Sequence, residues 1–168
     1  GVFRNFGLKE GLAPGAILAI LEDVKGNIWI GTTAGVSRIQ NGRVTSLTQE
    51  NAPLKDLVPV LVEDLEGRLW VGVNSGAAVI RFDPTEVDKV VGNPSYQLEY
   101  SLYDASDGMQ LGSQTWQAGV SGVRGGDGRL WVATGLGMTV IDPRSLPPSR
   151  RPPPPQIEGI VADGQRIS

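Results

Sequence analysis

Short apolar runs, each followed by an acidic pair and a glycine-containing turn, recur along the chain. Residues 17–21 and 58–62 are each long enough for a buried strand and too short for a helix. The turns that follow, residues 22–26 and 63–67, combine aspartate, which hydrogen-bonds nearby backbone, with glycine, which supplies a positive φ. A strand centred on tryptophan comes next in each case. The pattern therefore predicts β-hairpins.

The tryptophan strands show that these segments are copies of one unit. Trp29 and Trp70 lie about 40 residues apart and Trp131 follows after about one and a half such periods, a spacing that marks a repeat architecture. A third strand is predicted after a glycine in each unit, and a weaker fourth strand at residues 43–47 and 96–103. Four strands in a meander form one blade of a β-propeller. The predicted fold is all-β, built from four-stranded antiparallel blades.

The repeats predict a propeller region over residues 1–143. Residues 1–4 match residues 35–38, so the chain is expected to open within an earlier blade and to hold about three full blades. So few blades do not close a ring, and each open face would expose apolar side chains. The expected ring is incomplete: the chain is a fragment of a longer protein, which is the favoured interpretation, or it assembles with copies of itself.

The last part of the chain has a different character. Residues 144–155 hold half of the chain's 12 prolines. Such a run adopts polyproline II, so a semi-rigid linker is favoured over a ligand for SH3 or WW domains. Residues 156–168 alternate like a strand and turn at Asp163-Gly164, which predicts the first hairpin of a further β domain.

Composition narrows the possible functions. The 168-residue chain has a formal charge of −3 with interspersed signs, so neither a nucleic-acid surface nor a polybasic membrane patch is expected. It has no cysteine, which excludes disulfides and thiolate metal sites and leaves the compartment open, and no histidine, the commonest general base and transition-metal ligand. No catalytic constellation of other residues is recognisable. The sequence therefore predicts no catalytic residue, no metal site and no cofactor.

The acidic pairs before the turns admit two interpretations. Glu22-Asp23 and Glu63-Asp64 could be calcium ligands or an acid–base pair. Neighbouring strand residues point to opposite faces, and each pair is followed by a glycine, so capping of the turn is favoured.

Two further motifs also favour structural roles. Trp29, Trp70 and Trp131 could form a sugar-stacking platform, but their identical place in each unit favours packing between blades. Residues 125–128, Gly-Gly-Asp-Gly, resemble a phosphate loop, but a strand follows in place of a helix, so a hairpin turn is favoured.

A ligand-binding candidate lies outside the tryptophan register. Trp116 stands beside Gln114 and Gln117 in a predicted rim loop, the part of a propeller that usually carries function. An equal alternative is that Trp116 covers the closing seam of the ring. The turn residues Thr33 and Asn74, expected on the same rim, complete the candidate set, although they suit tight turns equally well.

Together these residues resemble the two-component regulator propeller family, whose repeat consists of an apolar strand, Asp-x-x-Gly, Leu/Ile-Trp-Ile-Gly-Thr and x-x-Gly-Leu/Val. Here Asp23 to Gly26, residues 28–32 and Gly35-Val36 match that repeat. Residues 103–109 are similar to the family's inter-blade signature, and residues 6–12 are a worn copy of it.

The end of the chain extends the resemblance. Residues 136–143, the proline-rich segment and residues 157–164 are similar to the family's last blade running into its Ig-like Y_Y_Y domain. Two departures stand out. The third repeat has Arg124-Gly125 in place of Glu-Asp, so its turn is expected to be built differently, and the second blade carries extra residues at about 83–94.

The resemblance implies the periplasmic sensor region of a membrane-bound signalling protein. In the family the Y_Y_Y domain leads to a transmembrane helix and a cytoplasmic output, usually a histidine kinase and sometimes a diguanylate cyclase. We therefore expect ligand sensing and signal transmission without catalysis in these blades, in the periplasm, as part of an inner-membrane protein. The expected partners are a small molecule or oligosaccharide, the remaining blades of the parent protein and, as an open alternative, a second copy in a homodimer. Nucleic acid and direct membrane contact are not expected.

Two other functions remain as alternatives. One is an enzyme of the streptogramin-lyase type, a propeller with a similar Gly-Asn-Leu-Trp-Phe repeat; its chemistry relies on a histidine base, which this chain lacks. The other is an interaction scaffold without signalling, against which the proline-rich exit into a Y_Y_Y-like strand argues.

Overall fold

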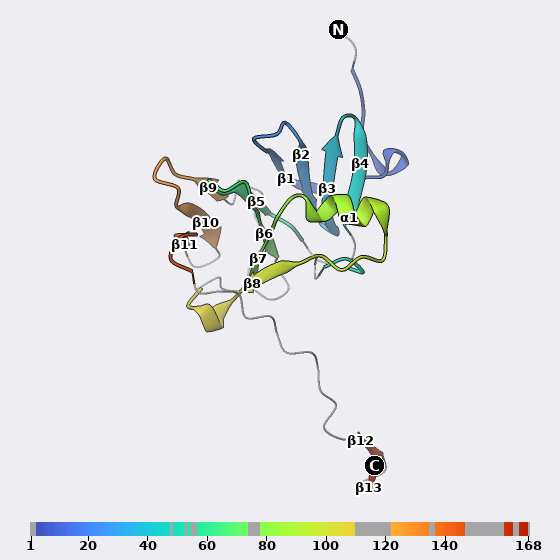
Figure 1. The fold of residues 1–168 in the computed structure, drawn as a ribbon, viewed down its shortest axis with the longest axis vertical. Helices are drawn as coiled ribbons and strands as arrows, with labels where there is room; N and C mark the ends of the chain where they lie inside the picture. The colour runs from blue at the N-terminus through green and yellow to red at the C-terminus, as the bar shows by residue number, and fades with distance from the viewer. Residues whose placement is uncertain are drawn as a thin grey trace.

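Consecutive strands pair into antiparallel sheets that follow one another in chain order (Figure 1). The computed structural model describes residues 3–47, 49–52, 54, 57–73, 78–109, 122–134, 137–146, 160–162 and 165–167. Each of the main sheets is a meander of neighbouring strands, as in a propeller blade. The predicted all-β architecture is confirmed, with a short helix as an addition.

The strands of the main sheets lie close to their predicted positions. The first sheet consists of β1 (Ile17–Glu22), β2 (Ile28–Thr32), β3 (Gly35–Gln40) and β4 (Arg43–Leu47). The second consists of β5 (Val60–Glu63), β6 (Leu69–Val73), β7 (Ala78–Phe82) and β8 (Tyr100–Tyr103). The third shows β9 (Gly122–Arg124), β10 (Leu130–Thr134) and β11 (Gly137–Ile141) among the described residues.

The first strands of the sheets lie next to one another, β1 beside β5 and β5 beside β9. Gly31, in β2, shows how closely the second sheet approaches the first. A Cβ atom at Gly31 would lie 2.3 Å from the carbonyl oxygen of Val58, which leads into β5. The amide of Val58 donates to Thr32 O at 2.9 Å. Gly31, two residues after Trp29, thus makes room for the backbone of the next sheet.

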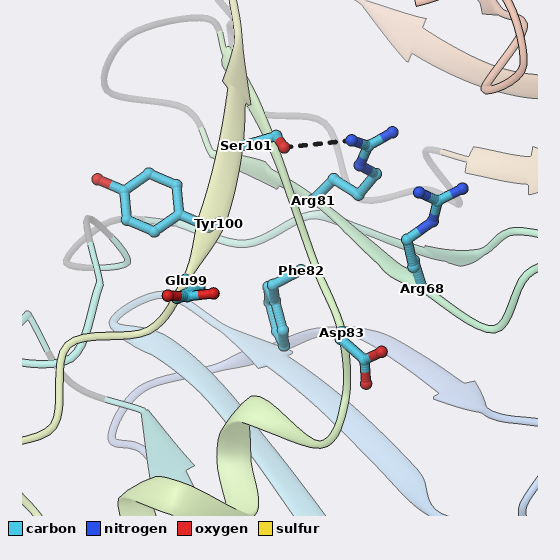
Figure 2. Close-up of a pocket in the computed structure, with 7 residues that line it drawn as sticks. All are labelled: Arg68, Arg81, Phe82, Asp83, Glu99, Tyr100 and Ser101. Atoms are coloured by element: carbon cyan, nitrogen blue, oxygen red, sulfur yellow. Dashed lines mark hydrogen bonds between the residues drawn. The ribbon is translucent and has the colours of Figure 1, made fainter. Parts of the chain in front are cut away.

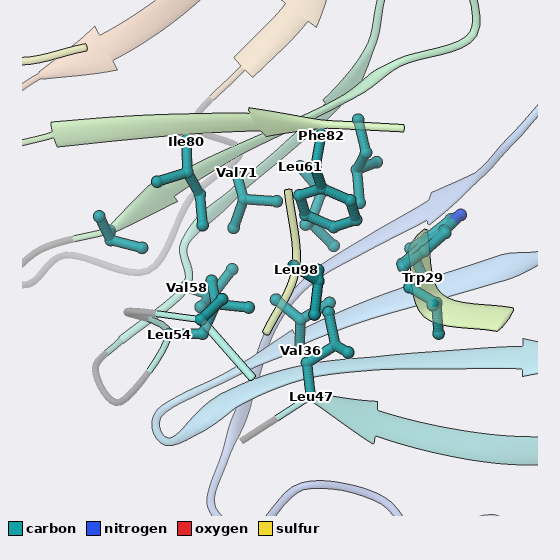
Figure 3. Packing of buried hydrophobic residues seen from close by; sticks show 14 of the residues in the cluster. Trp29, Val36, Leu47, Leu54, Val58, Leu61, Val71, Ile80, Phe82 and Leu98 are labelled. Carbon is teal, nitrogen blue, oxygen red and sulfur yellow. The ribbon is translucent and has the colours of Figure 1, made fainter. Parts of the chain in front are cut away.

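Two apolar cores fill the spaces between the sheets, and the tryptophans lie in them. Trp29 is fully buried between the first and second sheets and meets Phe82 edge-on at 6.0 Å between ring centroids (Figure 3). Trp70 is 1% exposed in the core shared by the second and third sheets. Packing between blades, rather than sugar stacking, is confirmed for both. Trp131 is only half-buried, so the third copy differs from the other two.

The extra residues of the second unit form the helix. α1 (Glu86–Gly92) contacts β4 of the first sheet and buries Val87 and Val90 in the first core (Figure 1). The segment that follows is also held by the first sheet's side of the molecule, because Asn51 Nδ2 donates to the carbonyls of Pro94, at 2.7 Å, and Tyr96, at 3.0 Å. The insertion therefore ties the second sheet to the first.

The inter-blade signature has one local structure in both of its copies. The 3₁₀ turns η1 (Leu8–Glu10) and η2 (Ala105–Asp107) each end at a left-handed glycine, Gly11 with φ 97° and Gly108 with φ 88°. In each turn the last acidic side chain accepts a hydrogen bond from the amide three residues earlier. The predicted equivalence of residues 6–12 and 103–109 is confirmed.

At the end of the chain, β12 (Ile160–Ala162) and β13 (Gln165–Ile167) form an antiparallel pair on either side of the predicted Asp163-Gly164 turn. The assignment of residues 144–155 to a linker and 156–168 to a Y_Y_Y-like domain stays a prediction. Within the described ranges, no helix has both the length and the apolar character that a membrane span requires.

Candidate functional site

A buried aspartate organises the turn between the first two strands of the first and second sheets. Asp64 Oδ1 accepts hydrogen bonds from the amides of Glu66 and Arg68, both at 2.9 Å. Its Oδ2 accepts from Trp70 Nε1, also at 2.9 Å. Asp23 makes the equivalent bonds in the first sheet. The predicted turn capping by both aspartates is confirmed, and the bond to the tryptophan was not foreseen.

These hydrogen bonds fix the charge of the aspartate. Burial works to raise the pKa of Asp23, but the hydrogen bonds from Trp29 and Asn27 outweigh it, so the pKa lies below its usual value. Asp23 is therefore ionised at neutral pH and acts as a hydrogen-bond acceptor. An acid–base role for this carboxylate has no support in the geometry.

The glutamate of the second acidic pair acts between sheets. Glu63 accepts a hydrogen bond from the amide of Val24, in the turn of the first sheet, at 3.0 Å to Oε2. Arg124, at the same place in the third sheet, donates from Nη1 to Asp64 O at 3.0 Å. The expectation that Glu63 caps its own turn is wrong, because its side chain reaches the preceding sheet instead.

An arginine on the third strand pairs with each buried tryptophan. Arg38 lies opposite Trp29 in the register of β2 and β3, and Arg81 lies opposite Trp70 in β6 and β7. The Arg81 guanidinium carbon is 5.4 Å from the Trp70 ring centroid and 5.5 Å from that of Tyr103. Stacking on aromatic rings holds the Arg81 side chain in place and leaves its N–H groups available at the edge of the sheet.

Arg81 lines an open cavity of about 480 Å³ at the end of the second sheet where the aspartate turn lies. The start of β6, the end of β7 and the start of β8 meet there (Figure 2). The full lining is Arg68, Arg81, Phe82, Asp83, Glu99, Tyr100 and Ser101. The close-up shows the side chains of Arg81 and Arg68 beside each other and the carboxylates of Asp83 and Glu99 apart from them (Figure 2).

The charges of the cavity have identifiable partners. Arg81 Nη2 donates to Ser101 Oγ at 3.2 Å. Arg68 Nε donates to Asp64 Oδ2 at 3.2 Å, and Arg68 Nη2 pairs with Glu66. Hydrogen bonds from the side chain and amide of Thr85 hold the pKa of Asp83 below its usual value. Asp83 is therefore ionised at neutral pH, and the lining carries positive charge on one side and negative charge on another.

In the first sheet the equivalent arginine is closed off. Arg38 Nη2 bonds Asp88 Oδ1 of α1 at 2.5 Å, and Nη1 donates to Pro84 O at 3.3 Å. The Arg38 side chain is 3% exposed as a result. One structural position thus carries an arginine paired with a carboxylate in the first sheet and an arginine paired with a serine hydroxyl in the second.

The predicted ligand-binding set is only partly visible. Thr33 lies in the turn between β2 and β3, half-buried, and its amide donates to Ala16 O at 3.1 Å. Trp116, Gln114, Gln117 and Asn74 lie outside the described residues. The structure therefore does not bring the set together.

The cavity at Arg81 lies at the other end of the strands from Thr33 and was missed by the sequence analysis. A usable signal was present: Arg38 and Arg81 occupy equivalent places on the third strands of their units. Only the register of those strands with the tryptophan strands shows that both guanidinium groups sit over a ring.

The described residues of the cavity are suited to binding. Ser101 Oγ accepts a hydrogen bond from Arg81 and so helps to hold the guanidinium in the cavity. No group of three or more potential metal-ligating side chains occurs within the described ranges. Charged and hydroxyl groups around an open hollow can recognise a polar solute.

A scan against protein families gives one match within the first repeat. Residues 11–34 match the Two component regulator propeller. The resemblance seen in the sequence is thereby confirmed for the segment that holds β1, the Asp23 turn and Trp29. A search of curated proteins finds no significant match.

Solved structures share the fold. The extracellular domain of a B. thetaiotaomicron protein described as a hybrid two component system is 18% identical, with a TM-score of 0.63 over 98% of this chain and 22% of that chain. The extracellular domain of a second such B. thetaiotaomicron protein is 22% identical, with a TM-score of 0.55 over 88% of this chain and 18% of that chain.

An enzyme has the same fold. Catalytically inactive virginiamycin B lyase from Staphylococcus aureus, solved with quinupristin, is 16% identical, with a TM-score of 0.50 over 76% of this chain and 41% of that chain. The present chain therefore spans about a fifth to two fifths of the length of these proteins.

Proposed function

We propose that this chain is part of an extracytoplasmic sensor region of a two-component signalling protein, and that it binds a ligand without transforming it. The observation that carries the proposal is the match of residues 11–34 to the Two component regulator propeller, in a chain whose second sheet repeats the Asp–Trp turn of the first. The likeness to extracellular domains of two-component systems supports it.

The finer parts of the proposal concern partners and place. A small molecule or oligosaccharide is the proposed ligand, the remaining blades of a parent protein or a second copy are the proposed protein partners, and the periplasmic side of an inner membrane is the proposed location. Signal transmission requires that the ligand prefer one conformation of the protein over another. The C-terminal residues 156–168 are the proposed route of transmission.

Hydrogen exchange measured by mass spectrometry tests the proposal. The 168-residue chain is screened by thermal shift against a panel of neutral and acidic mono- to tetrasaccharides, and exchange is compared with and without each compound that binds. We expect altered protection both in the blades and in residues 156–168. Protection confined to the blades for every compound that binds would count against transmission.

The lyase alternative has its own observation, the shared fold with virginiamycin B lyase. Incubation with quinupristin followed by mass spectrometry tests it. We expect no change in the mass or retention of the antibiotic, because the chain has no histidine. Turnover that a single carboxylate substitution abolishes would overturn the proposal that these blades lack catalysis.

A further inference from the structure

The cavity at Arg81 has a counterpart in the same chain that shows what such an arginine binds. Arg38 and Arg81 occupy equivalent register positions and stack over equivalent tryptophans. The guanidinium of Arg38 is closed by the carboxylate of Asp88. A planar guanidinium recognises a carboxylate through parallel N–H donors, so this partner is the one expected from its chemistry.

Among the described residues, no carboxylate of the third sheet pairs with Arg81, whose partner is Ser101. The segment after β11 begins like the segment after β7: Asp142 Oδ1 accepts from the amide two residues on at 3.1 Å, as Asp83 Oδ1 does at 2.8 Å. Leu146 packs against the second core where Val87 occupies the first. The next residue in the sequence is proline, where the earlier unit has Asp88.

The carboxylate of Asp142 is itself engaged. Arg144 binds it with both Nε and Nη2, each at 2.9 Å, and these bonds lower the pKa of Asp142 to about 2. The carboxylate of Asp142 is therefore already paired with Arg144. Among the described residues, the bond that Arg81 makes within its cavity is to the neutral hydroxyl of Ser101.

We propose that the cavity lined by Arg81, Arg68 and Ser101 is a binding site for a small polyhydroxylated monocarboxylate, whose carboxylate takes on Arg81 the place that Asp88 takes on Arg38. The inference rests on the proposed function, since it names the chemical class of the sensed ligand.

The remaining lining explains the preference for one carboxylate with hydroxyl groups. Asp83 is ionised at neutral pH and lines the same cavity, so it repels ligands that carry more than one negative charge. Hydroxyl groups can donate to such a carboxylate while the single acid group faces Arg81, because Arg68 is already paired with Asp64 and Glu66. The volume of about 480 Å³ suits a solute of six or so carbon atoms together with some water.

The test compares D-gluconate with D-sorbitol, two compounds that differ at one carbon, where gluconate carries a carboxylate. Binding to the 168-residue chain is measured by calorimetry at low ionic strength, and sulfate serves as the inorganic anion. We expect gluconate to bind at least tenfold more tightly than either sorbitol or sulfate. Equal binding of sorbitol, equal binding of sulfate, or no gluconate binding at 10 mM would overturn the proposal.

Two variants locate the site. Arg81→Gln is expected to weaken gluconate binding at least tenfold, whereas Arg129→Gln, which removes the same charge from an exposed arginine outside the cavity, is expected to change it less than twofold. Should Arg81→Gln not fold, a ¹⁵N NMR titration of the unaltered chain decides the question. Gluconate, and not sorbitol, must then shift the Arg81 Nε–H and Ser101 amide signals; absence of these shifts contradicts the assignment.

Failure of this inference can be told apart from failure of the proposed function. If gluconate does not bind but another compound changes hydrogen exchange in residues 156–168, the sensor proposal stands and the carboxylate site falls. If gluconate binds at Arg81 but no compound changes exchange in residues 156–168, the site stands and the sensing role falls.

Discussion

The second and third sheets make the same turn with different side chains. In the second, the amide of Asp64 donates to Arg68 O at 3.0 Å, and in the third the amide of Gly125 donates to Arg129 O at 2.8 Å. The return bond from the closing glycine is also present in both turns. The sequence-based expectation of a differently built third turn therefore holds for the side chains and fails for the backbone. Hairpin geometry and glycine suffice for the turn, and the aspartate has another task.

That task is to hold the tryptophan. Trp70 is 1% exposed, bonded to Asp64 and covered by Arg81. Trp131 is half-buried, and the residues opposite it on the neighbouring strands, Val123 and Val140, are 59% and 44% exposed. Asp64 and Arg81 thus accompany a tryptophan that is buried between blades. The third sheet has Gly125 and Val140 at the equivalent positions, on a face that the described residues do not cover.

Replacement of the buried aspartate is expected to destabilise the chain more than any other change. Asp64→Ala leaves the amides of Glu66 and Arg68 and the indole N–H of Trp70 without their acceptor, so we expect a loss of about 3 kcal/mol in the free energy of unfolding, measured with urea. The matched control is Asp127→Ala in the third turn, where a 53% exposed side chain loses one hydrogen bond from the amide of Arg129 and an exposed ion pair with the Arg129 side chain. Equal losses in the two variants would refute the role of the buried aspartate.

The next largest effect concerns the two arginines that stack on tryptophan. Asp88→Asn removes the charge that pairs with Arg38, which is 3% exposed, so we expect a loss of about 1–2 kcal/mol; the 55% exposure of Asp88 keeps the value below that of a fully buried pair. Urea unfolding measures the loss.

The control for Asp88→Asn is Asp142→Asn, which breaks the exposed pair with Arg144. We expect its midpoint to match that of the unaltered chain within error, because surface pairs contribute little. A midpoint shift as large as that of Asp88→Asn would show that the Arg38–Asp88 pair stabilises the chain no more than the Asp142–Arg144 pair does.

An aspartate placed in the third sheet, at the position equivalent to Asp64, is expected to stabilise the chain. A Cβ atom at Gly125 would lie 3.2 Å from Trp131 Nε1, and the backbone turn already matches that of the second sheet. Gly125→Asp is therefore expected to raise the free energy of unfolding by about 1 kcal/mol, once the side chain of Asp127 moves aside. Gly126→Asp, at a position with open space, controls for the added charge. A gain in both variants would remove the Asp–Trp bond as the cause.

Much of the fold could be read from residues whose effects are local. The Asp-x-x-Gly turns, the strand around each tryptophan and the 3₁₀ turn that ends at Gly108 all follow from short-range hydrogen bonds and positive φ values. The helix at residues 86–92 could not be read in this way, because its seven residues are too few to show a period. Its place is set by Val87 and Val90, which enter a core formed by two sheets.

The site depended on contacts between distant residues. Arg81 and Ser101 come from neighbouring strands and Arg68 from the turn before β6, so their meeting can be seen only when the strand register is known. The predicted candidates, by contrast, were chosen for a rim position, and Thr33 proves to be held in a backbone turn. Aromatic and amide side chains near a glycine-rich loop can be recognised in a sequence. The different partners of Arg81 and Arg38, a serine hydroxyl and a carboxylate, can be recognised only when the two sheets are compared in the structure.

The smallest predicted effect concerns the residues that link neighbouring sheets, Glu63 in the second sheet and Arg124 in the third. It is measured as the pH dependence of the free energy of unfolding. Burial, followed by repulsion from Asp23, raises the pKa of Glu63 in the folded protein, although the amide of Val24 opposes the shift. The unfolded chain therefore ionises first as pH rises, and the folded state loses stability from the usual pKa of glutamate up to the raised value. Glu63→Gln keeps an oxygen for Val24 and has no charge, so its advantage over the unaltered chain should grow between pH 4 and pH 7. Asp23 is present in both proteins, and its repulsion of Glu63 is part of the penalty that Glu63→Gln removes. Glu22→Gln, at the exposed equivalent position, controls for the exchange itself. A difference that stays flat across this range in urea unfolding would mean that the link from Glu63 to the first sheet carries no charge penalty, and that glutamate and arginine serve equally well between blades.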